Sequence, residues 1–292
     1  MSVATMNQVE VEVAPSRAPL GRLLGAELRW IFRRPRTLAV LGVLAVIPVA
    51  VGIGLTLVDS PGAGAGDGGE GAALLAAVAA NAFVLPIATL TLTLGLLLPL
   101  AVAMAGGDAL AGESAHSTLR GWLLAPVSRG RLLAVKAFGV VVFALAAVLA
   151  VAMSALLTGL AINGTDALFT LSGGALDFGS ALARIGLAVL WVTLQLAAVG
   201  AVALAISACT DHPMVVLASV LGGVVVFTLL GTLDALSWLH PFLLTESWRE
   251  TLADVLRDPM PTGSLTEGAL RAASYVVIAL SLAYARVVTK DG

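Results

Sequence analysis

Apolar residues occupy six long runs of the chain, and charged residues gather between these runs. Each run is about 20 residues long, the length that an α-helix needs to cross about 30 Å of hydrocarbon. Lipid offers backbone groups no hydrogen-bond partner, which favours a helix because a helix satisfies these groups internally. The pattern therefore predicts an all-α integral membrane protein with six transmembrane helices. The expected spans are 37–58, 81–105, 137–162, 183–208, 214–233 and 269–286.

Composition agrees with this assignment. The chain is 59 % hydrophobic and 12 % charged, with a mean hydropathy of +1.01, so nucleic acid is not an expected partner. Pro99 predicts a kink in the second span. We expect four segments, which are a disordered tail (1–16), an interfacial helix (17–36), the transmembrane domain (37–287) and a short tail (288–292).

Positive charge is distributed unevenly between the two faces. Twelve of the sixteen lysines and arginines fall before the first span, between the second and third spans, or at the carboxyl end. Because cytoplasmic flanks of membrane helices retain positive charge, this distribution predicts that both termini are cytoplasmic. It also predicts that Arg129, Arg131 and Lys136 anchor the start of the third span at the lipid headgroups. We expect a multi-pass protein of the inner, or cytoplasmic, membrane.

A second amphipathic segment is expected on the outer face, at about 245–258. Ser247 and Glu250 are spaced as a capping box, and Trp248 lies on the apolar face of the predicted helix. Such a helix could lie in the outer leaflet with Trp238 and Trp248 at headgroup level. It could equally pack on the bundle as a helical cap.

Sequence signals for catalysis are missing. The only lysines are Lys136 and Lys290, and neither follows the glycine-rich loop of a nucleotide-binding site. The three histidines and the single cysteine are spaced unlike a metal site, so we expect no enzyme activity and no metal in this chain. No ionisable residue stands at mid-span as a proton relay would require. Polar residues inside the spans favour helix packing, with a substrate path as the alternative; they are Thr89, Thr93, Thr193 and Gln195.

The segment after the second span carries charge and helical periodicity together. Between about 108 and 125, Leu119, Trp122 and Leu123 share an apolar sector, and Pro126 ends the predicted helix. A basic loop that only fixes topology would have a similar composition.

The order of residues in this segment resembles the cytoplasmic signature of type-two ABC exporter permeases. That signature contains Gly-Glu, then Gly-Thr-Leu, Leu-Leu, Pro-x-Ser-Arg and a lysine that opens the third span. The matching residues here are Gly112, Glu113, Thr118, Leu119, Leu123, Leu124, Pro126, Ser128, Arg129 and Lys136. The chain departs from the signature at Ser117, where the family has glycine, and at Arg120, where an acidic residue is common.

The amino-terminal segment resembles the interfacial elbow helix of the same family. Leucines at 20, 23, 24 and 28, with Ile31, form an apolar stripe for a helix that lies in the membrane plane. The polar residues that match the elbow motif before the first span are Glu27, Arg29, Arg33, Arg34 and Arg36.

The resemblance implies a half-transporter without its own ATPase. In this family the segment after the second span is a coupling helix that docks on a separate ATPase, which binds ATP and Mg²⁺. The expected partners are two ATPase copies, a second permease and membrane lipid, and the cargo is a hydrophobic or amphipathic compound such as a drug, antibiotic or lipid. A secondary transporter or channel, or a non-transporting membrane anchor for an ATPase, remains the alternative. The implied coupling residues are Glu113, Thr118, Leu119, Arg120, Trp122, Leu123, Pro126 and Arg129.

Overall fold

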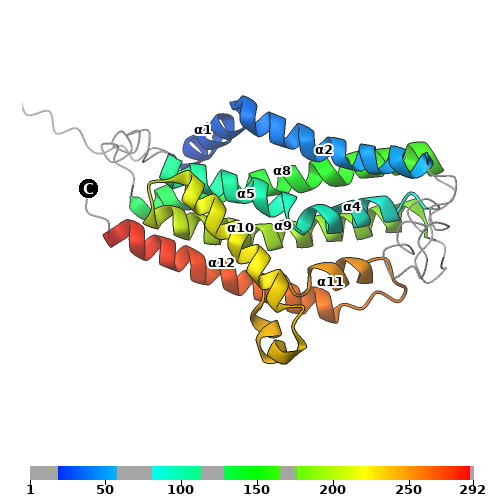
Figure 1. The fold of residues 1–292 in the computed structure, drawn as a ribbon. Helices are drawn as coiled ribbons and strands as arrows, with labels where there is room; N and C mark the ends of the chain where they lie inside the picture. Colours follow the sequence, from blue (N-terminus) through cyan, green and yellow to red (C-terminus); the bar gives the residue numbers. More distant parts are fainter. Residues whose placement is uncertain (1–18, 58–80, 113–127, 165–173, 175, 290–292) are drawn as a thin grey trace, which may run out of the picture.

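The computed structural model describes residues 19–57, 81–112, 128–164, 174 and 176–289. These residues form helices and connecting turns, and no strand occurs among them. The long helices run side by side in one bundle (Figure 1). The short helix α1 (Leu20–Arg33) and the last residues of α12 lie at one end, here called the α1 end. The helix α11 (Trp248–Asp254) lies toward the other end, here called the α11 end.

Five single helices and one bent pair are long and apolar enough to cross a membrane. The expectation of an all-helical membrane protein is therefore confirmed for the described part of the chain, which holds five candidate spans, or the expected six if the bent pair crosses as one span. Each predicted range falls on one of these elements. They are α2 (Pro35–Thr56), the pair α4 (Val84–Leu94) and α5 (Leu97–Gly107), α8 (Arg129–Asn163), α9 (Phe178–Cys209), α10 (Pro213–Leu230) and α12 (Gly263–Thr289).

Pro99 explains the bend between α4 and α5. The two helices meet at an angle of 54°, and the helical path is broken at Leu96, whose φ is −152°. A proline in a helix has no N–H for the carbonyl four residues earlier, which here belongs to Gly95, and its ring clashes with that carbonyl. The kink predicted at Pro99 thus falls one turn before the proline itself.

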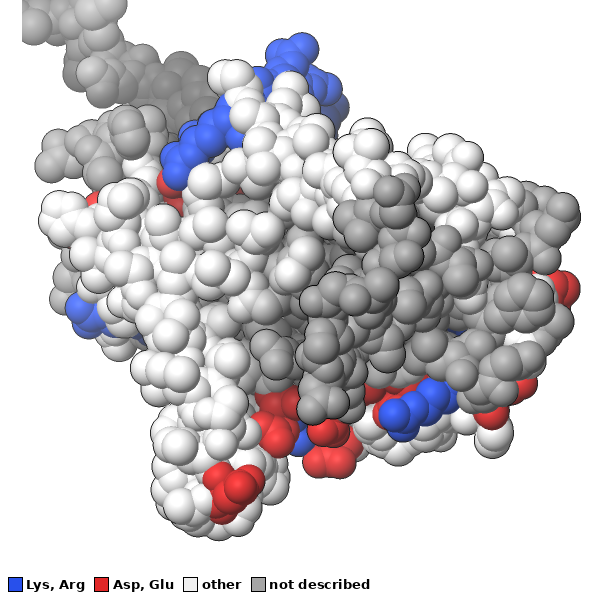
Figure 2. All heavy atoms as spheres, turned by 45° about the vertical axis from the view of Figure 1, so that its right-hand side comes forward, with Lys and Arg blue, Asp and Glu red and all other residues white. Residues whose placement is uncertain are grey.

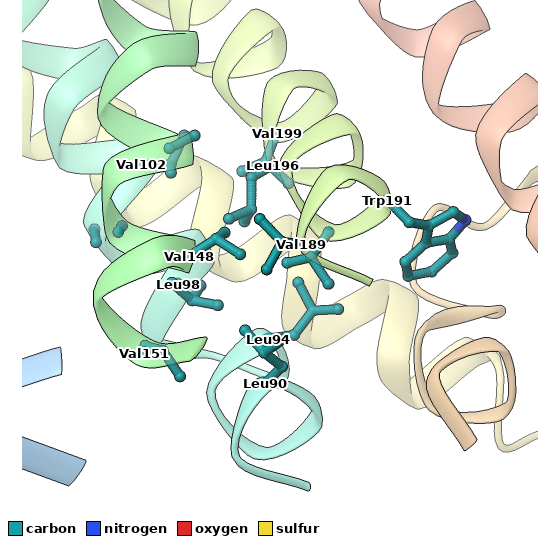
Figure 3. Close-up of a cluster of buried hydrophobic side chains, with 14 of the residues drawn as sticks. Leu90, Leu94, Leu98, Val102, Val148, Val151, Val189, Trp191, Leu196 and Val199 are labelled. Carbon is teal, nitrogen blue, oxygen red and sulfur yellow. The ribbon is translucent and has the colours of Figure 1, made fainter. Parts of the chain in front are cut away.

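Helix α9 forms the centre of the bundle. In its most apolar stretch 72 % of residues are buried, against 17 % for α2, α10 and α12. Leucines and valines of α4, α5 and α8 pack around one side of α9 in the cluster drawn in Figure 3. Trp191 lies on another side of α9, where its Nε1 donates to the carbonyl of Leu265 at 3.1 Å. The helices α2, α10 and α12 thus present most of their apolar surface outward.

Gly159 allows the close contact between α8 and the chain before α4. A β-carbon at this position would lie 2.7 Å from the carbonyl oxygen of Ala82, a backbone atom that cannot swing aside. We expect Gly159→Ala to lower the free energy of unfolding in detergent by about 1–3 kcal/mol through overpacking. Gly186→Ala on α9 is the control, since nothing lies within 4 Å of the added carbon. Thermal unfolding of both variants measures the difference, and equal midpoints would contradict the packing.

At the α11 end, the short helix α11 packs on the bundle. Trp248 is buried and donates from Nε1 to Oε1 of Gln195 at 3.3 Å, so it does not lie at the surface as the outer-leaflet alternative requires. Trp238, in the 3₁₀ helix η2 (Asp234–Phe242), is 69 % exposed. The capping box is not formed, because the side chain of Ser247 makes no cap hydrogen bond. Of the two alternatives, the structure has the helical cap.

Candidate functional site

The predicted coupling helix, at about 108–125, begins inside the described chain, and the residues on either side of 113–127 both lie at the α1 end. The π-helical turn η1 (Asp108–Gly112) precedes residues 113–127, and Arg129 begins α8 just after them. The intervening residues lie outside the described part of the chain, and with them Glu113, Thr118, Leu119, Arg120, Trp122, Leu123 and Pro126. The candidate site is therefore built from the contacts of the two flanks.

A turn at Pro35 places α1 against the bundle. Arg34, the residue before this proline, is extended with φ −74° and ψ 126°, because a following proline disfavours the helical region. Pro35 then opens α2 at a helix position that needs no N–H. The turned-back α1 packs Ile31 on α8 at Gly139, where an added β-carbon would lie 2.8 Å from Cδ1 of Ile31.

A buried ion pair fixes α1 to α8. Lys136 Nζ donates to both carboxylate oxygens of Glu27, at 3.2 and 3.0 Å. The two side chains are 0 % and 4 % exposed, so neither charge is hydrated by bulk water. Lys136 also lies 4.9 Å from the ring centroid of Trp30, and the guanidinium of Arg34 stacks 3.3 Å above the same ring. The ion pair and the contact between Lys136 and Trp30 thus join α1 to α8, whereas the stacking of Arg34 on Trp30 is local to the end of α1.

Asp108 ties η1 to the turn between α1 and α2. Its Oδ2 accepts a hydrogen bond from Arg36 Nη1 at 3.2 Å and lies 3.7 Å from Arg34 Nη1. Arg36 also donates from Nε to Sδ of Met104 on α5 at 3.1 Å. Asp108, which opens the turn before residues 113–127, is therefore paired with arginines at the end of α1 and the start of α2.

Ser207 of α9 holds the other side of η1. Its hydroxyl accepts from the backbone N–H of Ala111 at 2.8 Å and donates to the carbonyl of Gly107 at 3.2 Å. The hydroxyl is buried, and it satisfies backbone groups that the change from α- to π-helix leaves free. Gly106 lets α5 approach α9, since an added β-carbon would lie 2.6 Å from Cβ of Ala203.

Arg129 joins the start of α8 to the end of α12. Its Nη1 donates to the carbonyls of Val287 and Val288, at 3.0 and 2.7 Å. These carbonyls belong to the last turn of α12, where a cation also complements the helix dipole. We call the seven residues that make these contacts the polar collar. It consists of Glu27, Arg34, Arg36, Asp108, Arg129, Lys136 and Ser207.

Comparison with known proteins identifies the chain. A family model described as ABC-2 family transporter protein matches residues 23–286, which is 264 of the 292 residues. The chain belongs to this family. Curated proteins give no significant match. The ABC-2 model spans all of the polar collar, and the sequence resemblance to ABC exporter permeases is thereby confirmed at the level of the family.

The structure corrects one expectation about the charged residues of this ABC-2 chain, the headgroup anchor at Lys136, and shows where the other charged residues lie. Lys136 does not reach the lipid headgroups, because it is buried against Glu27. Arg129 lies at the flank of the coupling segment but points to α12. Arg29 and Arg33, which the sequence assigns to an elbow helix, are exposed on α1.

The predicted substrate-path residues lie inside the chain. Thr89, Thr93 and Thr193 each donate a hydrogen bond to a carbonyl of their own helix, and Gln195 Nε2 donates to the carbonyl of Gly268 at 3.0 Å. All four are buried, and these contacts are the ones expected of residues that pack helices. Their assignment to a substrate path stays a prediction.

Sequence reasoning did not single out Asp108 and Ser207 as functional residues. A signal existed for Asp108, which is an acid between an apolar span and the family signature. Ser207 gives no signal, because a serine near a helix end is ordinary and its partner lies 96 residues away.

Proposed function

We propose that this chain is the membrane-spanning subunit of an ATP-driven exporter and that residues 113–127 dock on a separate ABC ATPase. The observation that carries the proposal is that both flanks of this segment are fixed to the bundle by the polar collar. A push on the segment would reach α1 and α2 through Asp108, α9 through Ser207, and α12 through Arg129. Movement passed between packed elements in this way is a common means of coupling.

The orientation follows from charge. Arginines gather on α1 and at the start of α2, over the upper edge of the molecule in Figure 2. Acidic residues such as Asp234, Glu246 and Glu267 gather near η2 and the start of α12. Positive charge marks the cytoplasmic side of membrane proteins, so the α1 end, both termini and the coupling segment would face the cytoplasm. The ATPase, with its ATP and Mg²⁺, would bind there.

The cargo is proposed to be hydrophobic or amphipathic, such as a drug, antibiotic or lipid. Support comes from the described interior, where the hydroxyls of Thr89, Thr93 and Thr193 donate hydrogen bonds to carbonyls of their own helices. Few polar groups are therefore left there to bind a polar cargo. Among the described residues the centre of the bundle is filled by packed apolar side chains, so a second permease copy or a related chain would complete the path. Export, rather than import, rests on the resemblance to exporter permeases.

The experiment is purification followed by transport. The tagged full chain, isolated from its own cells in mild detergent, is expected to bring down an ABC ATPase. Inside-out vesicles with both proteins should accumulate a hydrophobic fluorescent dye when ATP is added, and vesicles whose ATPase lacks its phosphate-binding lysine should not. Flux without any ATPase would support a secondary transporter or channel instead. A bound ATPase without flux of this dye or other amphipathic probes would support a membrane anchor.

A further inference from the structure

Three arginines form a row on the outward face of α1. Arg22, Arg29 and Arg33 are separated by seven and four residues, so at 100° per residue they lie within about 40° of one another around the helix. Glu27 and Ile31, which are buried against α8, lie on the opposite side of α1. At 1.5 Å per residue the row is about 16 Å long. The side chains of all three arginines are exposed.

The row keeps its positive charge. Within the described part of the chain, no carboxylate forms an ion pair with these three arginines. Two described acids near α1 are engaged elsewhere, since Glu27 binds Lys136 and Asp108 binds Arg34 and Arg36. Among the described residues the three guanidinium groups therefore have no carboxylate partner, which leaves them for an external anion.

The surroundings of the row favour lipid over a protein partner. Apolar side chains flank it on α1, with Leu28 and Phe32 on one side and Trp30 on the other, and Leu20 at the start of the helix is 50 % exposed. Helix α2, which begins two residues after α1 ends, presents most of its apolar surface outward, and Leu38 in its first turn is 54 % exposed. The row thus lies where a membrane-crossing helix starts, which is the level of the headgroups.

We propose that Arg22, Arg29 and Arg33 bind the phosphate groups of anionic phospholipids in the leaflet at the α1 end. Guanidinium groups bind phosphate through paired N–H donors and stay charged at all physiological pH values. The arginine stems cover apolar surface while the charged ends reach the phosphates. This ligand is additional to the proposed function, and it needs neither an ATPase nor ATP. As a consequence, anionic lipid bound to the face of α1 opposite α8 would stabilise the packing of α1 on α8.

The ratio of the affinities for an anionic and a zwitterionic lipid tests this site. A basic residue near an anionic surface contributes about fivefold in affinity, so three should contribute about 100-fold. The probes are phosphatidylglycerol and phosphatidylcholine with identical acyl chains, titrated onto the isolated full chain in detergent and counted by native mass spectrometry. We expect wild type to prefer phosphatidylglycerol and the triple variant R22Q/R29Q/R33Q to lose about 100-fold in affinity for it. Phosphatidylcholine, whose phosphate charge is balanced by its own choline cation, should lose much less affinity.

Two variants control the titration. R22K/R29K/R33K keeps the charges and should keep most of the preference, although the paired N–H geometry is lost. Arg286→Gln removes one exposed arginine from the last turn of α12 at the same end, outside the row, and should lower the preference by no more than about fivefold. Equal affinities for the two lipids in wild type would overturn the proposal. So would a glutamine variant that keeps its lipid preference but no longer binds the ATPase, because the row would then meet an acidic protein surface.

Discussion

Replacing Lys136 by methionine is expected to release α1 from the bundle. The substitution keeps the length of the side chain but leaves the carboxylate of Glu27 buried without its cation. Breaking a buried ion pair in this way costs about 3–5 kcal/mol. Helix α1 can separate from α8 without unfolding the other helices, so the cost should show first as loss of α1 docking and only partly as loss of global stability. Limited trypsin cleavage at Arg22 and Arg29 measures the docking.

The double variant Glu27→Leu with Lys136→Met separates the charge effect from general damage. A buried pair replaced by apolar side chains of similar volume is often as stable as the pair itself, so most of the protection from trypsin should return. Arg286→Met, which removes an exposed cation at the same end, should change docking by less than about 0.5 kcal/mol. If the single and double variants were cleaved equally fast, the ion pair would not be what holds α1.

Replacing Trp122 by alanine is expected to weaken binding of the ATPase by about 2–4 kcal/mol, or roughly 30- to 1,000-fold. The reason is that tryptophan side chains in the centre of an interface carry a large part of the binding energy, and the sequence predicts Trp122 on the apolar sector that we propose as the docking face. The measurement is the affinity of the purified ATPase for the chain in lipid nanodiscs. Leu119→Ala and Leu123→Ala should weaken binding by smaller amounts.

The matched control is Trp238→Ala. Trp238 is an exposed tryptophan of η2, away from the polar collar and near the acidic residues around η2 and the start of α12. Its loss should therefore not change ATPase affinity. A variant at Trp122 that binds as tightly as wild type would show that the ATPase docks elsewhere, or that the segment only fixes topology.

The spans could be predicted because membrane crossing imposes a length and an apolar composition on each helix. The bend was predictable for a similar reason, since Pro99 lacks the N–H that α-helical continuity needs. Its position one turn before the proline follows from the carbonyl of Gly95, to which that N–H would have bonded. These features depend on residues close together in the sequence.

The polar collar could not be predicted, because its partners are far apart in the chain. Lys136 lies 109 residues from Glu27, and a lysine at the start of a span is usually a headgroup anchor. Only the packing of α1 on Gly139 brings the two charges together and removes them from water. Periodicity likewise showed that Trp248 lies on an apolar face but not whether lipid or Gln195 covers that face.

We propose that the segment between η1 and α8 meets an ATPase in the cytoplasm. Photo-cross-linking in intact cells tests it most directly, with benzoylphenylalanine placed at position 122 or, as control, at 238. We predict that position 122 captures an ABC ATPase, identified by mass spectrometry, in amounts that change when ATP is depleted, and that position 238 captures none. The account would be contradicted if a membrane-impermeant thiol reagent, used on Trp122→Cys in a Cys209→Ser background, labelled position 122 from outside the cell.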